Sequence, residues 1–189
     1  MTKLRKVLVA ALLLATAIVL NRFISIKTPI LVISFSALPI MLCGILLGPI
    51  WTMFVAGLSD LIGALLFPFG AYFVGYTISA ALAGLIYGLF LYRKKKQSKK
   101  IFILKIVVSI ILVLVVCNAT LNTLWIYLTT KKAVFAILPT RIIKQMIMLP
   151  ILGVSIYLID LGLDKAGIYH KLLENVEAEI DEKDVGEHD

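Results

Sequence analysis

An acidic residue, Asp60, lies inside the long apolar stretch of residues 50–67. A charged side chain near the centre of a bilayer costs roughly 2.5 to 3.5 kcal/mol on insertion scales, so such an acid usually faces a protein interior or a water-filled site. Asp60 is the first acidic residue of the chain, and the next is Asp160. We therefore expect Asp60 either to contact a ligand or to anchor the structure around it, and the sequence leaves both roles open.

A second group of polar side chains follows helical spacing. Asn118, Asn122 and Trp125 are four and three residues apart, which places two amides and an indole on one face of a helix. Their depth in the apolar stretch is predicted to match that of Asp60. The alternative is helix packing, because an Asn that bonds across membrane helices contributes about 0.6 kcal/mol on average. Together with the acid, the stripe favours a site for a planar heteroaromatic ligand.

Cations and aromatic rings are predicted at the same outer side. Arg141 and Lys144 are three residues apart just after Pro139, so they share one helix face and would attract an anionic group. Arg22 ends the first apolar stretch, where pairing with Asp60 is one of its possible roles. Four rings could stack on a ligand or instead belong to an interfacial aromatic belt: Phe67, Phe69, Tyr72 and Tyr76.

The elements that must position these residues are membrane helices. Hydrophobic residues make up 61% of the 189 residues, charged residues only 16%, and the mean hydropathy is +1.02. These values are typical of a chain that is mostly lipid-facing helix, and they predict an all-α membrane protein. A domain of six transmembrane helices is predicted for residues 1–165, with an acidic tail at 166–189. The six apolar stretches are residues 7–24, 34–47, 50–67, 71–92, 102–128 and 137–163.

Positive charge sets the orientation, because Lys and Arg near the ends of spans are retained on the cytoplasmic side. Lys3, Arg5 and Lys6 predict a cytoplasmic N-terminus. The basic run at residues 93–100 falls on the same side after four crossings. Two further crossings place the acidic C-terminal tail in the cytoplasm as well. We expect a multi-pass protein of the cell membrane.

The residues needed for ATP binding, metal binding or catalysis are missing from the expected patterns of the sequence. The chain has no GxxxxGK[ST] phosphate-binding loop, and Cys43 and Cys117 lie singly in apolar stretches. Both histidines, His170 and His188, are in the tail. We therefore expect no cofactor, no bound metal, no catalytic residues and no nucleic-acid partner. A membrane enzyme remains a weak alternative, because one acid without a paired carboxylate or a histidine cluster is a poor start for catalysis.

The chain resembles a known transporter family in several segments. These are residues 38–49, the block from Gly57 to Gly70 that includes Ser59-Asp60, residues 72–88, and residues 138–144, which read LPTRIIK. Together they are similar to the S components of energy-coupling factor (ECF) vitamin transporters. The match covers residues from Arg5 to about Leu163 and looks most like the folate-specific branch.

The resemblance implies a subunit that captures a vitamin from outside and does not itself power transport. A separate transmembrane scaffold (T) subunit and two cytoplasmic ATPases would do so, and the small-residue pair Ala11 and Ala15 would dock on the scaffold. For folate, Asp60 or Asn122 would pair with the donor edge of the pterin. Trp125 and Tyr72 would flank its ring, with Arg141 and Lys144 on the glutamate carboxylates. The alternatives are another vitamin, such as pantothenate or a pyridoxine-like compound, and a helper subunit without a ligand.

Overall fold

The computed structural model describes residues 3–27, 32–68, 72–92, 98–130, 134–165 and 167. Nearly all of these residues are helical, which confirms the predicted class. A small antiparallel ladder that the sequence did not indicate joins β1 (Ile26–Lys27) to β2 (Val32–Ile33), with Ile26 opposite Ile33. The helical elements are α1 (Lys3–Arg22), α2 (Ala37–Leu47), α3 (Pro49–Leu66), α4 (Val74–Leu91), α5 (Lys99–Val113), η1 (Leu114–Leu121), α6 (Asn122–Thr130) and α7 (Val134–Lys165).

Five helical segments within the described residues are long and apolar enough to cross a membrane. They are α1, α3, α4, the run from α5 through α6, and the second part of α7. The predicted second span, residues 34–47, is shorter than expected, because α2 has only 11 residues. At 1.5 Å per residue, α2 is about 16 Å long, against a hydrocarbon core of about 30 Å. The count of six crossings therefore stays a prediction.

The turn between α2 and α3 forms as the Gly48-Pro49 pair predicts. Gly48 has a φ of +88°, a conformation that residues with a side chain rarely adopt, and Pro49 opens α3 where a missing backbone N–H costs no helical bond. The Thr52 hydroxyl donates to the Gly48 carbonyl oxygen at 2.7 Å. This tight connection lets α2 and α3 both lie against α4.

Glycines allow α4 to approach its neighbours closely. Gly84 lies against the carbonyl of Thr52 on α3, and Gly88 lies against Pro49 and Gly48. Gly44 of α2 also faces the backbone of Gly88. Small residues of this kind are typical of helix contacts within membranes, where close backbone packing replaces the hydrophobic effect. The pair α3 and α4 makes the most extensive contact in the fold.

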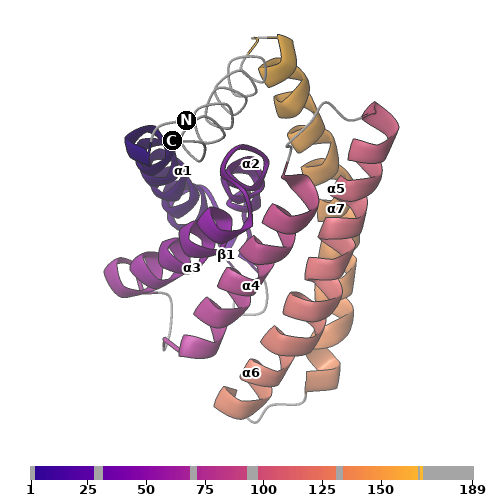
Figure 1. The fold of residues 1–189 in the computed structure, drawn as a ribbon. Coiled ribbons are helices and arrows are strands. Elements are labelled where there is room, and N and C mark those ends of the chain that lie inside the picture. Colours follow the sequence, from indigo (N-terminus) through magenta and orange to yellow (C-terminus); the bar gives the residue numbers. More distant parts are fainter. Residues whose placement is uncertain are drawn as a thin grey trace, which may run out of the picture.

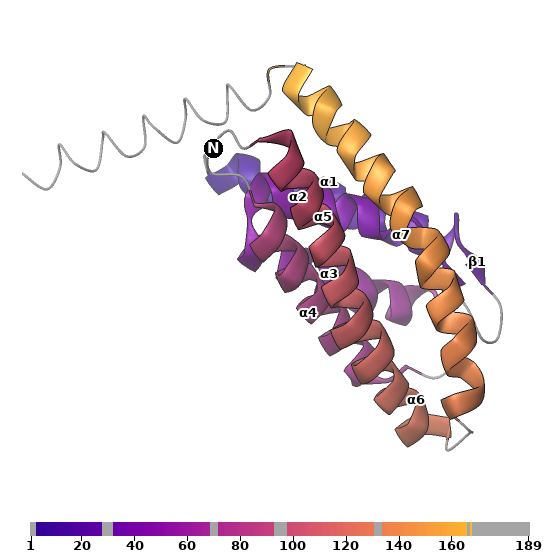
Figure 2. The ribbon, with the colours of Figure 1, turned by 90° about the vertical axis from the view of Figure 1, so that its right-hand side faces the viewer.

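The remaining helices complete a bundle around α4. Figure 1 shows α1, α2 and α3 on one side of α4 and the continuous run of α5, η1 and α6 on the other, and Figure 2 shows α7 beside that run. A core of fully buried apolar side chains joins α2, α4, α5 and α7; its members include Met41, Ile45, Leu91, Phe102, Ile106 and Ile156. A smaller cluster joins α1 to α2 and α3.

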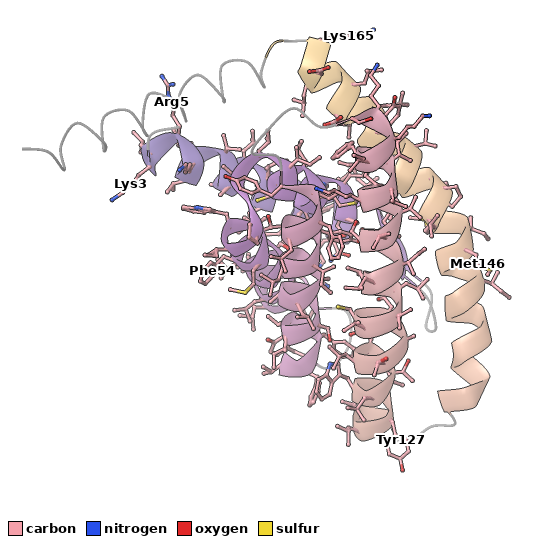
Figure 3. The ribbon with its side chains drawn as sticks, turned by 45° about the vertical axis from the view of Figure 1, so that its right-hand side comes forward. Lys3, Arg5, Phe54, Tyr127, Met146 and Lys165 are labelled. Carbon is pink, nitrogen blue, oxygen red and sulfur yellow. The ribbon has the colours of Figure 1, made fainter. Side chains whose placement is uncertain are left out.

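The start of α1 and the end of α7 lie toward the same end of the bundle. Figure 3 shows Tyr127, near the end of α6, at the end of the molecule opposite Lys165, with Lys3 and Arg5 toward the Lys165 end. Residues 93–97, which include the basic run Arg93 to Lys96, and the acidic tail, apart from Gly167, lie outside the described residues.

Candidate functional site

Most of the predicted site residues gather at the end of the bundle where α3 meets α4 and where α6 ends. Asp60 and Phe67 come from α3 and its end, Tyr72 from just before α4, Tyr76 from its first turn, and Trp125 from α6. Three of them belong to two groups of contacting residues, which we call the Asp60 network (Asp60, Thr77, Tyr72) and the Trp125 platform (Trp125, Ser79, Gly75, Phe73).

The Asp60 network links α3 to the turn before α4. The Thr77 hydroxyl donates to Oδ2 of Asp60 at 2.9 Å. The Tyr72 hydroxyl lies 2.9 Å from the same Thr77 oxygen. Because Thr77 donates its proton to the carboxylate, its oxygen can accept from Tyr72. Asp60 thus fixes the direction of a chain of hydroxyls that ends on an exposed ring at the site.

Arg22 lies beside this network. Its Nη1 group donates to the carbonyl oxygen of Phe67 at 3.3 Å, and its Nε atom lies 2.8 Å from where a Cβ on Gly63 would be. A cation at the end of α3 complements the negative end of that helix. Gly63 is three residues after Asp60, so the two positions are neighbours on one face of α3. Direct pairing of the two charges stays a prediction.

The Trp125 platform links α6 to α4. The indole Nε1–H donates to the Ser79 hydroxyl at 2.9 Å, and Ser79 is only 3% exposed. The ring lies over Gly75, where an added Cβ would be 2.6 Å from Cδ2 of Trp125. Phe73 packs against the same ring at a centroid distance of 5.6 Å. Hydrogen bond, close approach and ring contact together fix the plane of the indole.

Asn118 and Asn122 form an amide pair, as their spacing predicted. The Asn122 Nδ2 group donates to Oδ1 of Asn118 at 3.2 Å. The Oδ1 atom of Asn122 is buried and has no hydrogen-bond partner within the described part of the chain. A buried acceptor left without a donor costs about 1 to 3 kcal/mol. A ligand N–H would remove that cost, so Asn122 offers a ready acceptor.

The two groups lie on different faces of α4. Thr77 faces Asp60 and Ser79 faces Trp125, and residues two apart on an α-helix are separated by about 200° around its axis. Helix α4 therefore carries one contact from each group. The sequence predicted the acid and the indole at one depth, and the structure adds that they reach α4 from opposite sides.

The other predicted residues are placed less fully. Phe67 packs edge-on against Phe23 at 5.0 Å, and Tyr76 packs against Phe73 at 6.1 Å. Arg141 and Lys144 belong to α7, but their side chains lie outside the described part of the structure.

The predicted docking pair lies on the outer surface of the bundle. Ala11 and Ala15 are both exposed on α1, on the face opposite its buried residues Ala10, Leu13 and Ala17. No other helix of the described structure covers these two alanines, so a partner could approach the backbone of α1 there.

Sequence reasoning missed Thr77, Ser79, Gly63 and Gly75. Hydroxyls in an apolar stretch can be recognised as possible interhelix hydrogen-bond partners, and small residues as points of close approach. Their spacing alone does not say which neighbouring helix each one faces. That information comes only from the packing of α4 between α3 and α6.

Comparisons with known proteins agree with this architecture. The chain is 41% identical over 157 residues to the folate transporter FolT of Clostridium novyi (strain NT), covering 83% of this chain and 88% of that protein. It is 33% identical over 162 residues to the folate transporter FolT of Leuconostoc mesenteroides subsp. mesenteroides, covering 82% and 85%. A solved structure, described as FolT bound with folic acid, is 35% identical with a TM-score of 0.72 and covers 80% of this chain and 89% of the other.

The family follows from a separate match. The family model described as "ECF transporter, substrate-specific component" matches residues 5–159. It describes a transport component and not an enzyme, so the membrane-enzyme alternative is wrong. The apolar helices and this match together identify a multi-pass membrane protein. The chain belongs to the family of substrate-specific (S) components of ECF transporters.

Proposed function

We propose that this chain binds folate from the outside, as the substrate-capture subunit of an ATP-driven ECF importer in the cell membrane. The observation that carries the proposal is the similarity, over 80% of the chain and at a TM-score of 0.72, to a FolT structure that contains folic acid. Two relatives named as folate transporters support the same ligand. The site adds a chemical reason, because it combines a flat indole, a buried free acceptor and a carboxylate network.

The proposal includes how the subunit sits in the membrane and what it assembles with. Residues 1–165 form six crossings, α2 being the short one, and residues 166–189 form a cytoplasmic tail; both termini are cytoplasmic. A T subunit and two ATPases supply the energy. The exposed pair Ala11 and Ala15 on α1 contacts the T subunit, where two methyl groups in place of larger side chains allow close helix approach.

Each site residue has a proposed role. The free Oδ1 of Asn122 accepts a hydrogen bond from the donor edge of the pterin, and Trp125 and Tyr72 flank its ring. Asp60 acts through Thr77 to hold Tyr72 in place.

Arg141 and Lys144 bind the glutamate carboxylates through charge-assisted hydrogen bonds. Five further residues complete the site or support it: Arg22, Phe67, Tyr76, Asn118 and Thr77.

Calorimetry on the purified chain in detergent tests the ligand. Folic acid should bind, whereas pantothenate and pyridoxine should give no heat. Asp60→Ala and Arg141→Ala should each weaken folate binding at least about tenfold, or ~1.4 kcal/mol. Asp164→Ala and Lys165→Ala are the matched controls, because these exposed charges lie at the other end of α7.

The competing ligands give distinct outcomes. Binding of pantothenate or pyridoxine instead of folate would assign the subunit to another vitamin. No binding of any vitamin by a chain that is monodisperse on size exclusion would favour a helper subunit without a ligand. Unchanged folate affinity in both Asp60→Ala and Arg141→Ala would reject the proposed site while leaving the ligand in place.

A further inference from the structure

The helix that carries the amide pair and Trp125 is not a regular α-helix. Between α5 and α6, η1 is a π-helix, in which hydrogen bonds reach back five residues instead of four. The backbone N–H of Asn122 bonds the carbonyl of Cys117. The hydroxyls of Thr120 and Thr123 also reach back five residues, to the carbonyls of Val115 and Asn118.

The ordinary helical parts of the chain behave differently. The hydroxyl of Thr16 reaches back four residues to Leu12, and that of Thr129 reaches back four residues to Trp125. Both five-residue contacts from threonine hydroxyls therefore lie at η1, and one backbone bond of this length, from Ile24 to Val19, lies just past the end of α1. A π turn holds about one residue more than an α turn, so residues after it are rotated by about 100° relative to those before it.

The burial pattern shows what this rotation does. On α5 and into η1, the inward stripe follows α-helical steps of three and four residues: Phe102, Ile106, Ser109, Val113 and Cys117 are all buried. Continued in the same steps, the stripe would pass through Thr120, Leu124 and Tyr127. All three are exposed, with Leu124 at 45% and Tyr127 at 57%.

Polar residues occupy the inward face instead. After η1, Trp125 bonds Ser79 on α4, and Asn122 turns a buried oxygen toward the interior. Without the π turn, Leu124 would point toward α4, and Asn122 and Trp125 would turn away from it. Figures 1 and 2 show α5, η1 and α6 as one continuous rod beside α4, so the change of face occurs inside a single span.

We propose that the π turn of η1 positions the recognition face of the site by absorbing one extra residue of the chain. It keeps an apolar stripe inward on α5 and brings the Asn122 and Trp125 side chains inward on α6. Their role toward folate rests on the proposed function, whereas the rotation itself does not. Val115 lies in η1 and its side chain is 51% exposed. Its deletion therefore shortens the helix by one residue without removing a buried side chain.

Deleting Val115 gives an unusual expectation. A regular α-helix one residue shorter restores the relation between α5 and α6, so Asn122 and Trp125 still face α4. Folic acid should therefore bind within about threefold of wild type. Tryptophan emission should also be unchanged in a Trp51→Phe background, where Trp125 is the one remaining tryptophan of the chain.

Deleting Ile78 is the matched control. This residue is also apolar, exposed and within a span, but α4 is a regular helix without a spare residue. Its loss rotates Thr77 and Gly75 away from Asp60 and Trp125, and we expect no measurable folate binding.

The outcomes separate this inference from the proposed ligand. Wild-type protein that does not bind folate would contradict the proposed function, and the Trp125 emission would still test the rotation. Wild-type binding together with loss of binding, a shifted emission or aggregation after deletion of Val115 would overturn the inference.

Discussion

The position of Trp125 depends on the absence of a side chain at Gly75. In Gly75→Ala, the new methyl group would overlap the indole at 2.6 Å and Phe73 at 2.5 Å. We expect the indole to move away from Ser79, with a red-shifted emission in the Trp51→Phe background. Overpacking of this kind costs about 1 to 3 kcal/mol, so folate affinity should fall by about tenfold or more.

Gly162→Ala is the control for this substitution. Gly162 is also helical, and a methyl group there meets no atom within 4 Å. The same chemical change should leave folate affinity and tryptophan emission at their wild-type values. Equal effects of the two substitutions would show that the loss of glycine flexibility, and not the contact with Trp125, is responsible.

At the scale of single residues, the sequence predicted the stripe but not its partners. The spacing of Asn118 and Asn122 indicated a shared face, and their amides do contact each other. The hydroxyl partners could not be predicted, because a hydroxyl in a membrane helix often bonds its own backbone. Ser109 bonds the carbonyl of Ile106 in this way, whereas Ser79 accepts from another helix. Residue type does not distinguish the two cases.

At the scale of elements, the close packing of α4 against the α2–α3 turn should dominate stability. In Gly88→Ala, the methyl group would overlap the Cα of Pro49, which cannot move without displacing the turn at Gly48. Backbone atoms move aside less easily than the ends of side chains, so we expect the free energy of unfolding to fall by about 1 to 3 kcal/mol. A thermal melt in detergent, followed by size exclusion, measures it.

Gly153→Ala provides the comparison for the packing of α4. Its methyl group would have one neighbour, a carbon of Ile106 at 3.9 Å, which is ordinary van der Waals contact. The melting temperature should not fall. If Gly88→Ala had the same melting temperature as Gly153→Ala, the close approach of α4 to the turn would not be a source of stability.

Element boundaries were largely predictable, whereas the π turn was not. Gly48-Pro49 marked the junction of α2 and α3 within a residue, because glycine conformation and proline geometry act locally. The span predicted at residues 102–128 gave no sign of η1. The polar face of Asn118, Asn122 and Trp125 has the spacing of a regular α-helix, so it does not mark where the inward stripe changes register. Only the exposure of Leu124 and the contacts of Trp125 reveal the shift.

At the scale of the whole molecule, family membership was predictable because it rests on extended motifs. The blocks from Gly57 to Gly70 and at residues 138–144 indicated an S component, and the family match over residues 5–159 confirms it. Membrane topology is a different matter, because α2 is too short to count as a span by length alone. Whether α2 crosses decides whether the two termini lie on the same side of the membrane.

Labelling of introduced cysteines in intact cells tests whether the number of crossings is even or odd. The natural Cys43 and Cys117 are 0% and 2% exposed, so they give a low background to a membrane-impermeant maleimide. Lys3→Cys and Lys165→Cys should react only after the cells are opened, whereas Tyr127→Cys should react in intact cells. Figure 3 places Lys3 and Lys165 away from the Tyr127 end, as an even number of crossings requires. With five crossings, Lys3→Cys and Lys165→Cys would react on opposite sides, and the six-span proposal would be wrong. If Lys3→Cys and Lys165→Cys both react only after the cells are opened, the number of crossings is even. In that case the short α2, together with the turn at Gly48, spans the membrane.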